Sequence, residues 1–186
     1  MDGLLSAAAI QELLDDVDRR LVAAGRSASV LLVGGAAIAL SGLREDRVTR
    51  DVDALTREEE LLRQVAREVA ADRGLPADWL NSRARQWMPP VPSSLWPVDT
   101  SPGLHVVRAD DGFLLATKLV AQRRKDADDV VALAERLGLR GASPAVLEAH
   151  IRAYYTDPEQ LAFVVDGPEV DAEVRFLAED AARLLA

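Results

Sequence analysis

The expected fold of this 186-residue chain rests on one stretch of sequence, VLLVGGAAIALSGLREDRVTRDVDAL, at residues 30–55. Four apolar residues, Val30 to Val33, open the stretch and are typical of a strand that is buried on both faces. Two glycines follow directly, and the apolar residues after them predict a short helix over 36–40. The stretch ends with Asp51 to Leu55, where polar and apolar residues alternate, as expected of a second strand with one face in water.

Helices are expected on both sides of this stretch. Apolar residues at helical spacing predict an amphipathic helix over 4–24 and two more long helices, over 57–73 and about 112–137. Residues 104–108 are a candidate for a third strand. From residue 143 onward, prolines and a glycine divide the sequence into two or three further helices.

Residues 76–103 have a different composition. They hold six prolines and all three tryptophans of the chain. Proline breaks a helix because it lacks the backbone N–H and fixes φ. The segment is therefore predicted to be a structured loop, with Trp79, Trp87 and Trp96 as its packing anchors.

Strands placed between helices predict an α/β (α+β) fold, with a small mixed sheet flanked by helices and a helical C-terminal third. The length of 186 residues is that of about one domain. We expect a single domain over residues 1–186, with a core at about 26–138 and a helical extension at about 143–186.

Composition excludes several kinds of site and protein. The chain has no cysteine, which excludes disulfides and thiolate zinc sites, and only two histidines, which argues against a histidine-rich metal site. A net charge of −9 argues against nonspecific DNA binding, which depends on basic residues. The sequence lacks an apolar run of about 18 residues and a basic leader, so we expect a cytoplasmic protein with no membrane span.

The acidity is concentrated at the two ends of the sequence. Residues 41–126 carry 14 acidic and 14 basic side chains, and the excess of acids lies before and after them. A local site for an anion in this middle part is therefore compatible with the overall charge.

The first candidate for chemistry is the glycine pair, Gly34 and Gly35, between the buried strand and the short helix. Glycines there let the backbone approach a ligand closely, and free N–H groups attract phosphate. The alternative is a structural turn with no ligand.

The second candidate is the aspartate pair, Asp51 and Asp53. Residues two apart on a strand point to the same face, so the two carboxylates would share one side while Val52 faces the core. Such a pair can share a hard cation such as Mg²⁺. The alternative is that both acids face water at the edge of a strand.

The third candidate lies within the helix expected over 112–137. On a regular helix its polar residues would form one stripe about a quarter of the circumference wide. Arg123 would fall on the apolar side, as a possible partner in a buried ion pair. A solvated face with ion pairs between successive turns is the alternative. The stripe consists of Lys118, Gln122, Lys125, Asp126 and Asp129.

The order of these features resembles the signature of the nucleotidyltransferase superfold related to DNA polymerase beta. The glycine pair is followed by a basic segment, at Arg44, Arg47 and Arg50, and then by the aspartate pair. KLVAQRRKDADD, at 118–129, resembles the second signature of a bacterial branch that holds AbiEii-like toxins of type IV toxin–antitoxin systems and small uncharacterised relatives. DWLN, at 78–81, resembles a segment of the uncharacterised group.

The resemblance, which covers roughly residues 30–135, implies a role for each matching residue. The glycines would cradle a triphosphate, and the aspartate pair would hold Mg²⁺, in a two-metal site if the protein is active. Lys118 would contact phosphate, and Asp126 or Asp129 would act on the nucleophile or orient Lys118. The implied catalytic residues are Asp51, Asp53, Lys118 and Asp126, and the implied nucleotide-binding residues are Gly34, Gly35, Arg50, Lys118, Arg123 and Asp129.

The implied activity is transfer of a nucleoside monophosphate from an NTP to an RNA such as tRNA, to a protein or to a small molecule. A cognate antitoxin is an implied partner. Two departures from the family pattern support an alternative, a non-catalytic nucleotide- or partner-binding descendant. Gly35 stands where serine is frequent, and the strand at 104–108 contains His105 but no carboxylate. A helical protein that docks a partner through its acidic C-terminal third is a third possibility.

Overall fold

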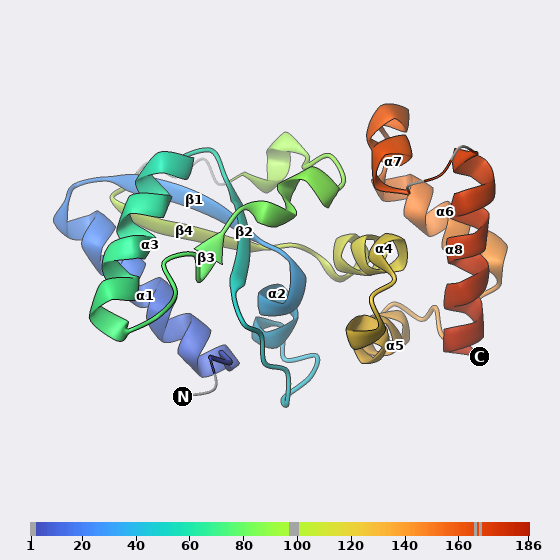
Figure 1. The fold of residues 1–186 in the computed structure, drawn as a ribbon, viewed down its shortest axis with the longest axis horizontal. Helices are drawn as coiled ribbons and strands as arrows, with labels where there is room; N and C mark the ends of the chain where they lie inside the picture. Colours follow the sequence, from blue (N-terminus) through green and yellow to red (C-terminus); the bar gives the residue numbers. More distant parts are fainter. Residues whose placement is uncertain (1–2, 97–100, 166, 168) are drawn as a thin grey trace. The chain divides into compact units, whose positions relative to one another are not determined.

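A four-stranded mixed sheet forms the centre of the first half of the chain (Figure 1). Its strand order is β3-β2-β1-β4. β1 pairs antiparallel with β2 and parallel with β4, and β2 pairs parallel with the short β3. Of the apolar run predicted as a buried strand, Val30 to Leu32 lie in β1, at the centre of the sheet, and Val33 follows as the N-cap of α2. All four residues are buried. The strands are β1 (Ser27–Leu32), β2 (Val52–Thr56), β3 (Leu80–Asn81) and β4 (Gly103–Arg108).

Three helices accompany the sheet: α1 (Ala7–Ala23), α2 (Gly34–Leu40) and α3 (Glu59–Arg73). α1 packs against β4 and β1 and contacts α2 and α3. Trp79 is 1% exposed, and its indole N–H donates to the carbonyl of Ala66 on α3 over 2.9 Å. This tryptophan therefore anchors the loop after α3, as predicted.

The second half of the chain is helical. Its helices are α4 (Asp111–Ala121), α5 (Ala127–Arg136), α6 (Pro144–Tyr154), α7 (Pro158–Val164) and α8 (Val170–Leu185). α6 packs against α8, and α4 contacts α5, α6 and α8. The predicted fold class, a small mixed sheet with helices around it and a helical C-terminal part, is confirmed.

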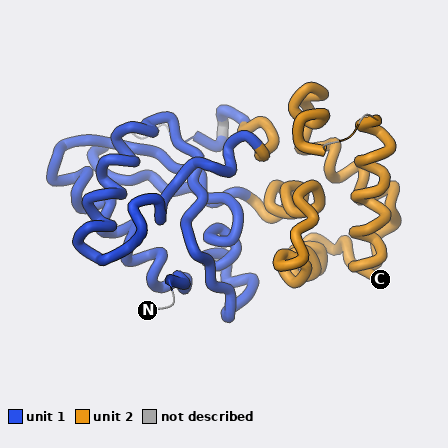
Figure 2. The backbone as a smooth tube through the Cα atoms, in the orientation of Figure 1, with its two compact units in different colours: residues 1–86, 92–109 blue, residues 87–91, 110–186 orange. Residues whose placement is uncertain are grey.

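The computed structural model describes residues 3–96, 101–165, 167 and 169–186. Contacts divide the chain into two compact units (Figure 2). Unit 1 comprises residues 1–86 and 92–109, and unit 2 comprises residues 87–91 and 110–186. Within the described ranges, no helix has both the length and the apolar character needed to cross a bilayer.

The division differs from the predicted core at about 26–138. The boundary follows Ala109, and the N-terminal helix α1 belongs with the sheet. The physical reason is packing, because α4 and α5 bury their apolar faces against α6 and α8 within unit 2.

The prediction of one continuous helix over 112–137 is wrong, because the helix breaks at Gln122. This residue takes the left-handed conformation, with φ +42°, and a single 3₁₀ turn at Arg124–Asp126 leads into α5. The Gln122 side chain donates to the carbonyl of Leu177 over 2.8 Å, a contact that holds the break against α8. The predicted polar stripe therefore does not exist as one helical face, and Arg123 is exposed instead of buried.

Trp87 also differs from the prediction, since it is 43% exposed although its ring stacks on Phe163 at 5.4 Å. Trp96 is half-buried, and the guanidinium of Arg57 lies over its ring, 5.0 Å from the ring centroid.

Hydrogen bonds from two side chains of α6, His150 and Tyr154, hold the start of α4 in place. The Asp110 carboxylate accepts from the N–H of Phe113 over 2.7 Å and from the hydroxyl of Tyr154 over 3.1 Å, and His150 Nε2 donates to the carbonyl of Gly112 over 3.0 Å. Burial raises the pKa of Tyr154 to about 12, and the charge of Asp110 adds to the effect. Burial lowers the pKa of His150 below its ordinary value of 6.5.

Acidification is expected to destabilise the protein through His150. Between its lowered folded-state pKa and 6.5, the unfolded chain takes up a proton that the folded chain does not, so the free energy of unfolding falls as the pH drops through that window. Each unit of pKa lowering corresponds to about 1.4 kcal/mol. Urea unfolding at pH 7.5 and pH 5 should show a smaller loss for His150→Gln than for the wild type or His105→Gln. Equal losses of unfolding free energy in the wild type and both variants would contradict the role of His150.

Candidate functional site

One end of the sheet in unit 1 gathers polar residues from several segments. β1 ends there and β2 begins there, because the two strands are antiparallel and Leu32 pairs with Ala54. β3 joins at the same end, with Asn81 in register with Asp53. We call this group, Gly34, Asp51, Asp53 and Asn81, the carboxylate edge.

Gly34 brings the backbone against a carboxylate. Its φ is +62°, a conformation that favours glycine, and a Cβ built on it would lie 3.0 Å from Oδ2 of Asp53. The N–H of Val33 also donates to the carbonyl of Asp53 over 3.0 Å. The turn after β1 and the start of β2 are therefore fixed to each other, and a Cβ at position 34 would require Oδ2 of Asp53 to shift by a few tenths of an ångström.

Substituting Gly34 is expected to cost more stability than the same change at a matched glycine. Gly42 has a similar φ of +65° but open space around its Cα, so Gly42→Ala reports the backbone strain alone, about 1 kcal/mol. Gly34→Ala adds the contact with Asp53 and should lower the free energy of unfolding by at least about 1 kcal/mol more. Urea unfolding of both variants measures the difference. Equal losses would show that the approach to Asp53 is not tight.

Gly35 makes room for a different pair of side chains. A Cβ at this position would lie 3.0 Å from a guanidinium nitrogen of Arg47 and 3.1 Å from Oγ1 of Thr49. Thr49 in turn donates to the backbone carbonyl of Asp51 over 3.1 Å. This packing is a physical reason for glycine at this position. Arg50 is exposed and forms no ion pair with a described residue.

Asn81 holds the carboxylate of Asp51. Its Nδ2 donates to Oδ2 of Asp51 over 3.2 Å, and its own Oδ1 accepts from the N–H of Arg83 over 2.9 Å. The carboxamide is thus oriented on one side and directs Asp51 on the other. Sequence reasoning did not select Asn81. Its only signal was its place at the end of the DWLN segment, because the register of β3 against β2 is a tertiary feature.

Asp51 and Asp53 are both half-buried, and they are the residues of the carboxylate edge that could hold a metal ion. Among the described residues, no group of three or more histidine, aspartate or glutamate side chains could do so. Mg²⁺ commonly takes one or two protein carboxylates and completes its octahedron with water and substrate phosphates. Two carboxylates therefore suit Mg²⁺ bound together with a phosphorylated substrate better than a cage made only of protein ligands.

The acids that follow β4 have other partners within unit 2. Asp110 caps α4, and Asp111 pairs with Arg136 at 3.4 Å. The last residue of β4 is Arg108, which pairs with Leu32 in the register of the sheet.

In unit 2, the break in the helix brings three charged side chains together. Lys118 Nζ lies 3.0 Å from Oδ1 of Asp126 and 3.0 Å from Oδ2 of Asp129. Their exposed fractions are 5% for Lys118, 5% for Asp126 and 0% for Asp129. This buried triad is not a solvated face, and the Lys118 ammonium is paired with both carboxylates.

The predicted site residues thus form two groups, one in each unit. Unit 1 holds Gly34, Gly35, Arg50, Asp51 and Asp53, and unit 2 holds Lys118, Arg123, Asp126 and Asp129. No family model, curated protein or solved structure matches the chain. A functional assignment therefore depends on the chemistry that each group can perform.

Proposed function

We propose that the chain is a Mg²⁺-dependent nucleotidyltransferase that uses the carboxylate edge. The observation that carries the proposal is the Asp53 carboxylate lying against the left-handed turn at Gly34. A phosphate bound at this turn would lie close to the Asp53 carboxylate, and the two anions would repel each other. Mg²⁺ held by Asp51 and Asp53 would reduce that repulsion, because carboxylate oxygens are ligands that Mg²⁺ prefers.

The proposed reaction needs little covalent work from the protein. An acceptor oxygen attacks the α-phosphorus of the NTP, the bond from that phosphorus to the bridging oxygen breaks, and pyrophosphate leaves with its electron pair. The acceptor proton passes to solvent or to a base. Mg²⁺ neutralises charge on the phosphates when bound. Asp51 and Asp53 would hold Mg²⁺, Asn81 would orient Asp51, and the Gly34 turn would let the phosphates approach.

Asn81 is expected to affect the Mg²⁺ concentration that the transfer reaction requires. Asn81→Ala frees the Asp51 carboxylate to rotate, and losing a group that orients a ligand typically costs about 10–100-fold in metal affinity or activity. The Mg²⁺ concentration for half-maximal transfer should rise about tenfold, with a smaller change in the rate at saturating Mg²⁺. Asn81→Gln, which keeps the amide, should recover part of the loss. An unchanged Mg²⁺ requirement in Asn81→Ala would remove this residue from the site.

The roles that the resemblance implies for Lys118, Asp126 and Asp129 stay predictions. The low exposure of all three supports a second candidate function, a non-catalytic nucleotide-binding descendant of the same fold. A lysine that already pairs with two buried carboxylates needs no phosphate to balance its charge.

A transfer assay separates the two functions. The full chain is incubated with Mg²⁺ and α-³²P-labelled NTPs, in separate reactions with tRNA, with the chain alone and with small hydroxylated acceptors. The proposed function predicts a labelled acceptor whose labelling is abolished by EDTA. Nucleotide binding without any labelled product would favour the second candidate. A toxin-like role and a cognate antitoxin would be tested next, on the acceptor found.

A further inference from the structure

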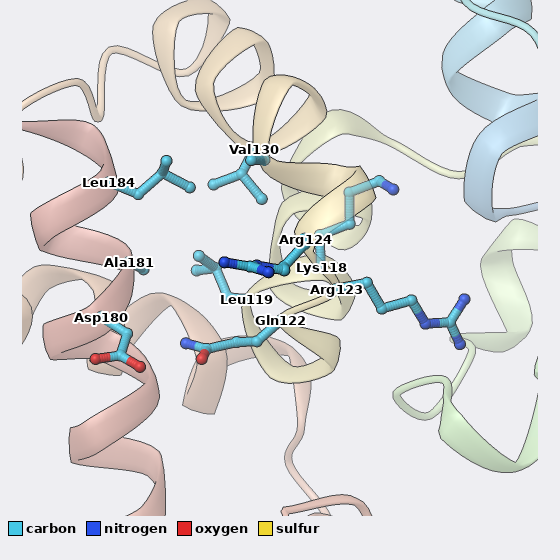
Figure 3. A pocket seen from close by; sticks show the side chains of 10 residues that line it. Lys118, Leu119, Gln122, Arg123, Arg124, Val130, Asp180, Ala181 and Leu184 are labelled. Atoms are coloured by element: carbon cyan, nitrogen blue, oxygen red, sulfur yellow. The ribbon is translucent and has the colours of Figure 1, made fainter.

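A pocket of about 140 Å³ lies within unit 2, between α4, the turn after it, α5 and α8 (Figure 3). Its inner walls are apolar. Leu119, Val130 and Ala181 are buried, and Leu184 stands at the rim, 42% exposed. A cavity of this volume accommodates a body about the size of a benzene ring, since an apolar cavity of about 150 Å³ binds benzene.

One arginine side chain that has no partner among the described residues points into the pocket. The guanidinium of Arg124 is directed toward α8 between the apolar walls, whereas that of Arg123 points away (Figure 3). Among the residues that the structure describes, Arg124 has neither a hydrogen-bond acceptor nor an ion-pair partner. It is exposed, so its charge is available to a ligand.

The other polar groups around the pocket already have partners. The Gln122 amide donates to the carbonyl of Leu177 over 2.8 Å, and Asp180 pairs with Arg183. The Lys118 ammonium is paired within the buried triad. The polar group that is left to bind a ligand is therefore a single cation, the Arg124 guanidinium, next to apolar walls.

The turn that carries Arg124 is held at both ends. The N–H of Gln122 donates to the carbonyl of Lys118 over 3.0 Å, and the N–H of Asp126 donates to the carbonyl of Arg123 over 2.8 Å. The ion pair between Lys118 and Asp126 ties the same two ends together. A ligand would therefore meet an arginine whose backbone is already fixed in place, so only its side chain has to be ordered on binding.

We propose that this pocket binds a small organic carboxylate with an apolar body about the size of one ring. The carboxylate would pair with Arg124, whose planar guanidinium matches carboxylate geometry, and the body would lie against Leu119, Val130 and Ala181. A phosphate dianion fits less well, because it has no apolar part to lie against these walls. The proposal does not depend on the nucleotidyltransferase function.

Calorimetric titration of the full chain tests the proposal with three probes: phenylacetate, benzyl alcohol and inorganic phosphate. The variants are Arg124→Gln, Ala181→Leu, which fills the pocket, and Arg175→Gln as a control, since Arg175 is an exposed arginine of α8 with no partner among the described residues. Saturable binding of phenylacetate is expected. Loss of the charge-assisted hydrogen bonds should weaken it at least about tenfold in Arg124→Gln, with no change in Arg175→Gln.

Ala181→Leu should also weaken phenylacetate, and benzyl alcohol should bind the wild type at least about tenfold more weakly than phenylacetate does. The proposal is overturned if phenylacetate does not saturate the wild type, or if it binds Arg124→Gln as tightly as the wild type. It is also overturned if phosphate binds as well as phenylacetate, because the turn would then be a general anion site.

Discussion

Asp53→Asn is expected to lower Mg²⁺-dependent nucleotidyl transfer at least about a hundredfold while the protein stays folded. The carboxamide has nearly the same shape as the carboxylate, so the contacts of the Gly34 turn are preserved. It carries no charge and is a weaker ligand for a hard cation, and even groups that only orient a metal ligand cost about 10–100-fold. Initial rates of labelled transfer at saturating NTP measure the effect, and thermal unfolding verifies the fold.

Asp46→Asn is the matched control for this variant. Asp46 is an exposed aspartate of unit 1 that pairs with Arg44 at 3.0 Å and is not part of the carboxylate edge. Its substitution should leave the rate within about twofold of the wild type, in line with the small effects of most surface changes. Transfer by Asp53→Asn at the rate of Asp46→Asn would remove Asp53 from the mechanism.

Lys118→Met is expected to destabilise the protein by about 3–5 kcal/mol. The substitution keeps most of the apolar stem but removes the cation between two buried carboxylates. Breaking a buried ion pair leaves an uncompensated charge in the interior, whose desolvation is no longer offset. The free energy of unfolding from urea titration measures the loss.

The chain supplies a close control, because its only other lysine, Lys125, is exposed on the 3₁₀ turn that follows α4. Lys125→Met should change the free energy of unfolding by no more than about 0.5 kcal/mol. Adding Asp129→Asn to Lys118→Met should recover part of the loss, since it removes one of the two carboxylates. Equal stabilities for the two lysine variants would mean that the triad contributes nothing to the fold.

Three of the four strands of the described sheet, β1, β2 and β4, and most helices follow from local sequence, whereas β3 lies in the segment predicted to be a loop. Val30 to Val33 are apolar without a break, and the structure buries them at the centre of the sheet, where both faces of a strand are covered. α3 ends at Gly74 in the left-handed conformation, as its glycine indicates. In such segments the periodicity of the apolar side chains and the turn residues indicate the same element, so the local sequence is sufficient to predict it.

The break at Gln122 could not be predicted in this way. Neither glycine nor proline marks it, and a regular helix over 112–137 satisfies the apolar pattern. Its stabilising contacts come from elsewhere: Leu177 lies 55 residues along the chain, and the triad forms only because the helix is broken. Asn81 was missed for a related reason, because its contact with Asp51 depends on the register of a two-residue strand.

The sequence selected Gly34 and Asp53 separately, and their contact is a feature of the tertiary structure. The glycines were expected to let the backbone approach a ligand, and the neighbour that the structure places at Gly34 is the Asp53 carboxylate. The buried state of Lys118, Asp126 and Asp129 was not predicted, because charges spaced along a helix usually indicate a solvated surface.

Binding of Mn²⁺, followed by electron paramagnetic resonance, tests the carboxylate edge most directly. The full chain and the Asp51→Asn/Asp53→Asn double variant are titrated with Mn²⁺ in the presence and absence of a non-hydrolysable NTP analogue. We predict that the wild type binds Mn²⁺ together with the analogue more tightly than the analogue alone does, and that the double variant loses this gain. The same Mn²⁺ binding in both proteins would contradict the account.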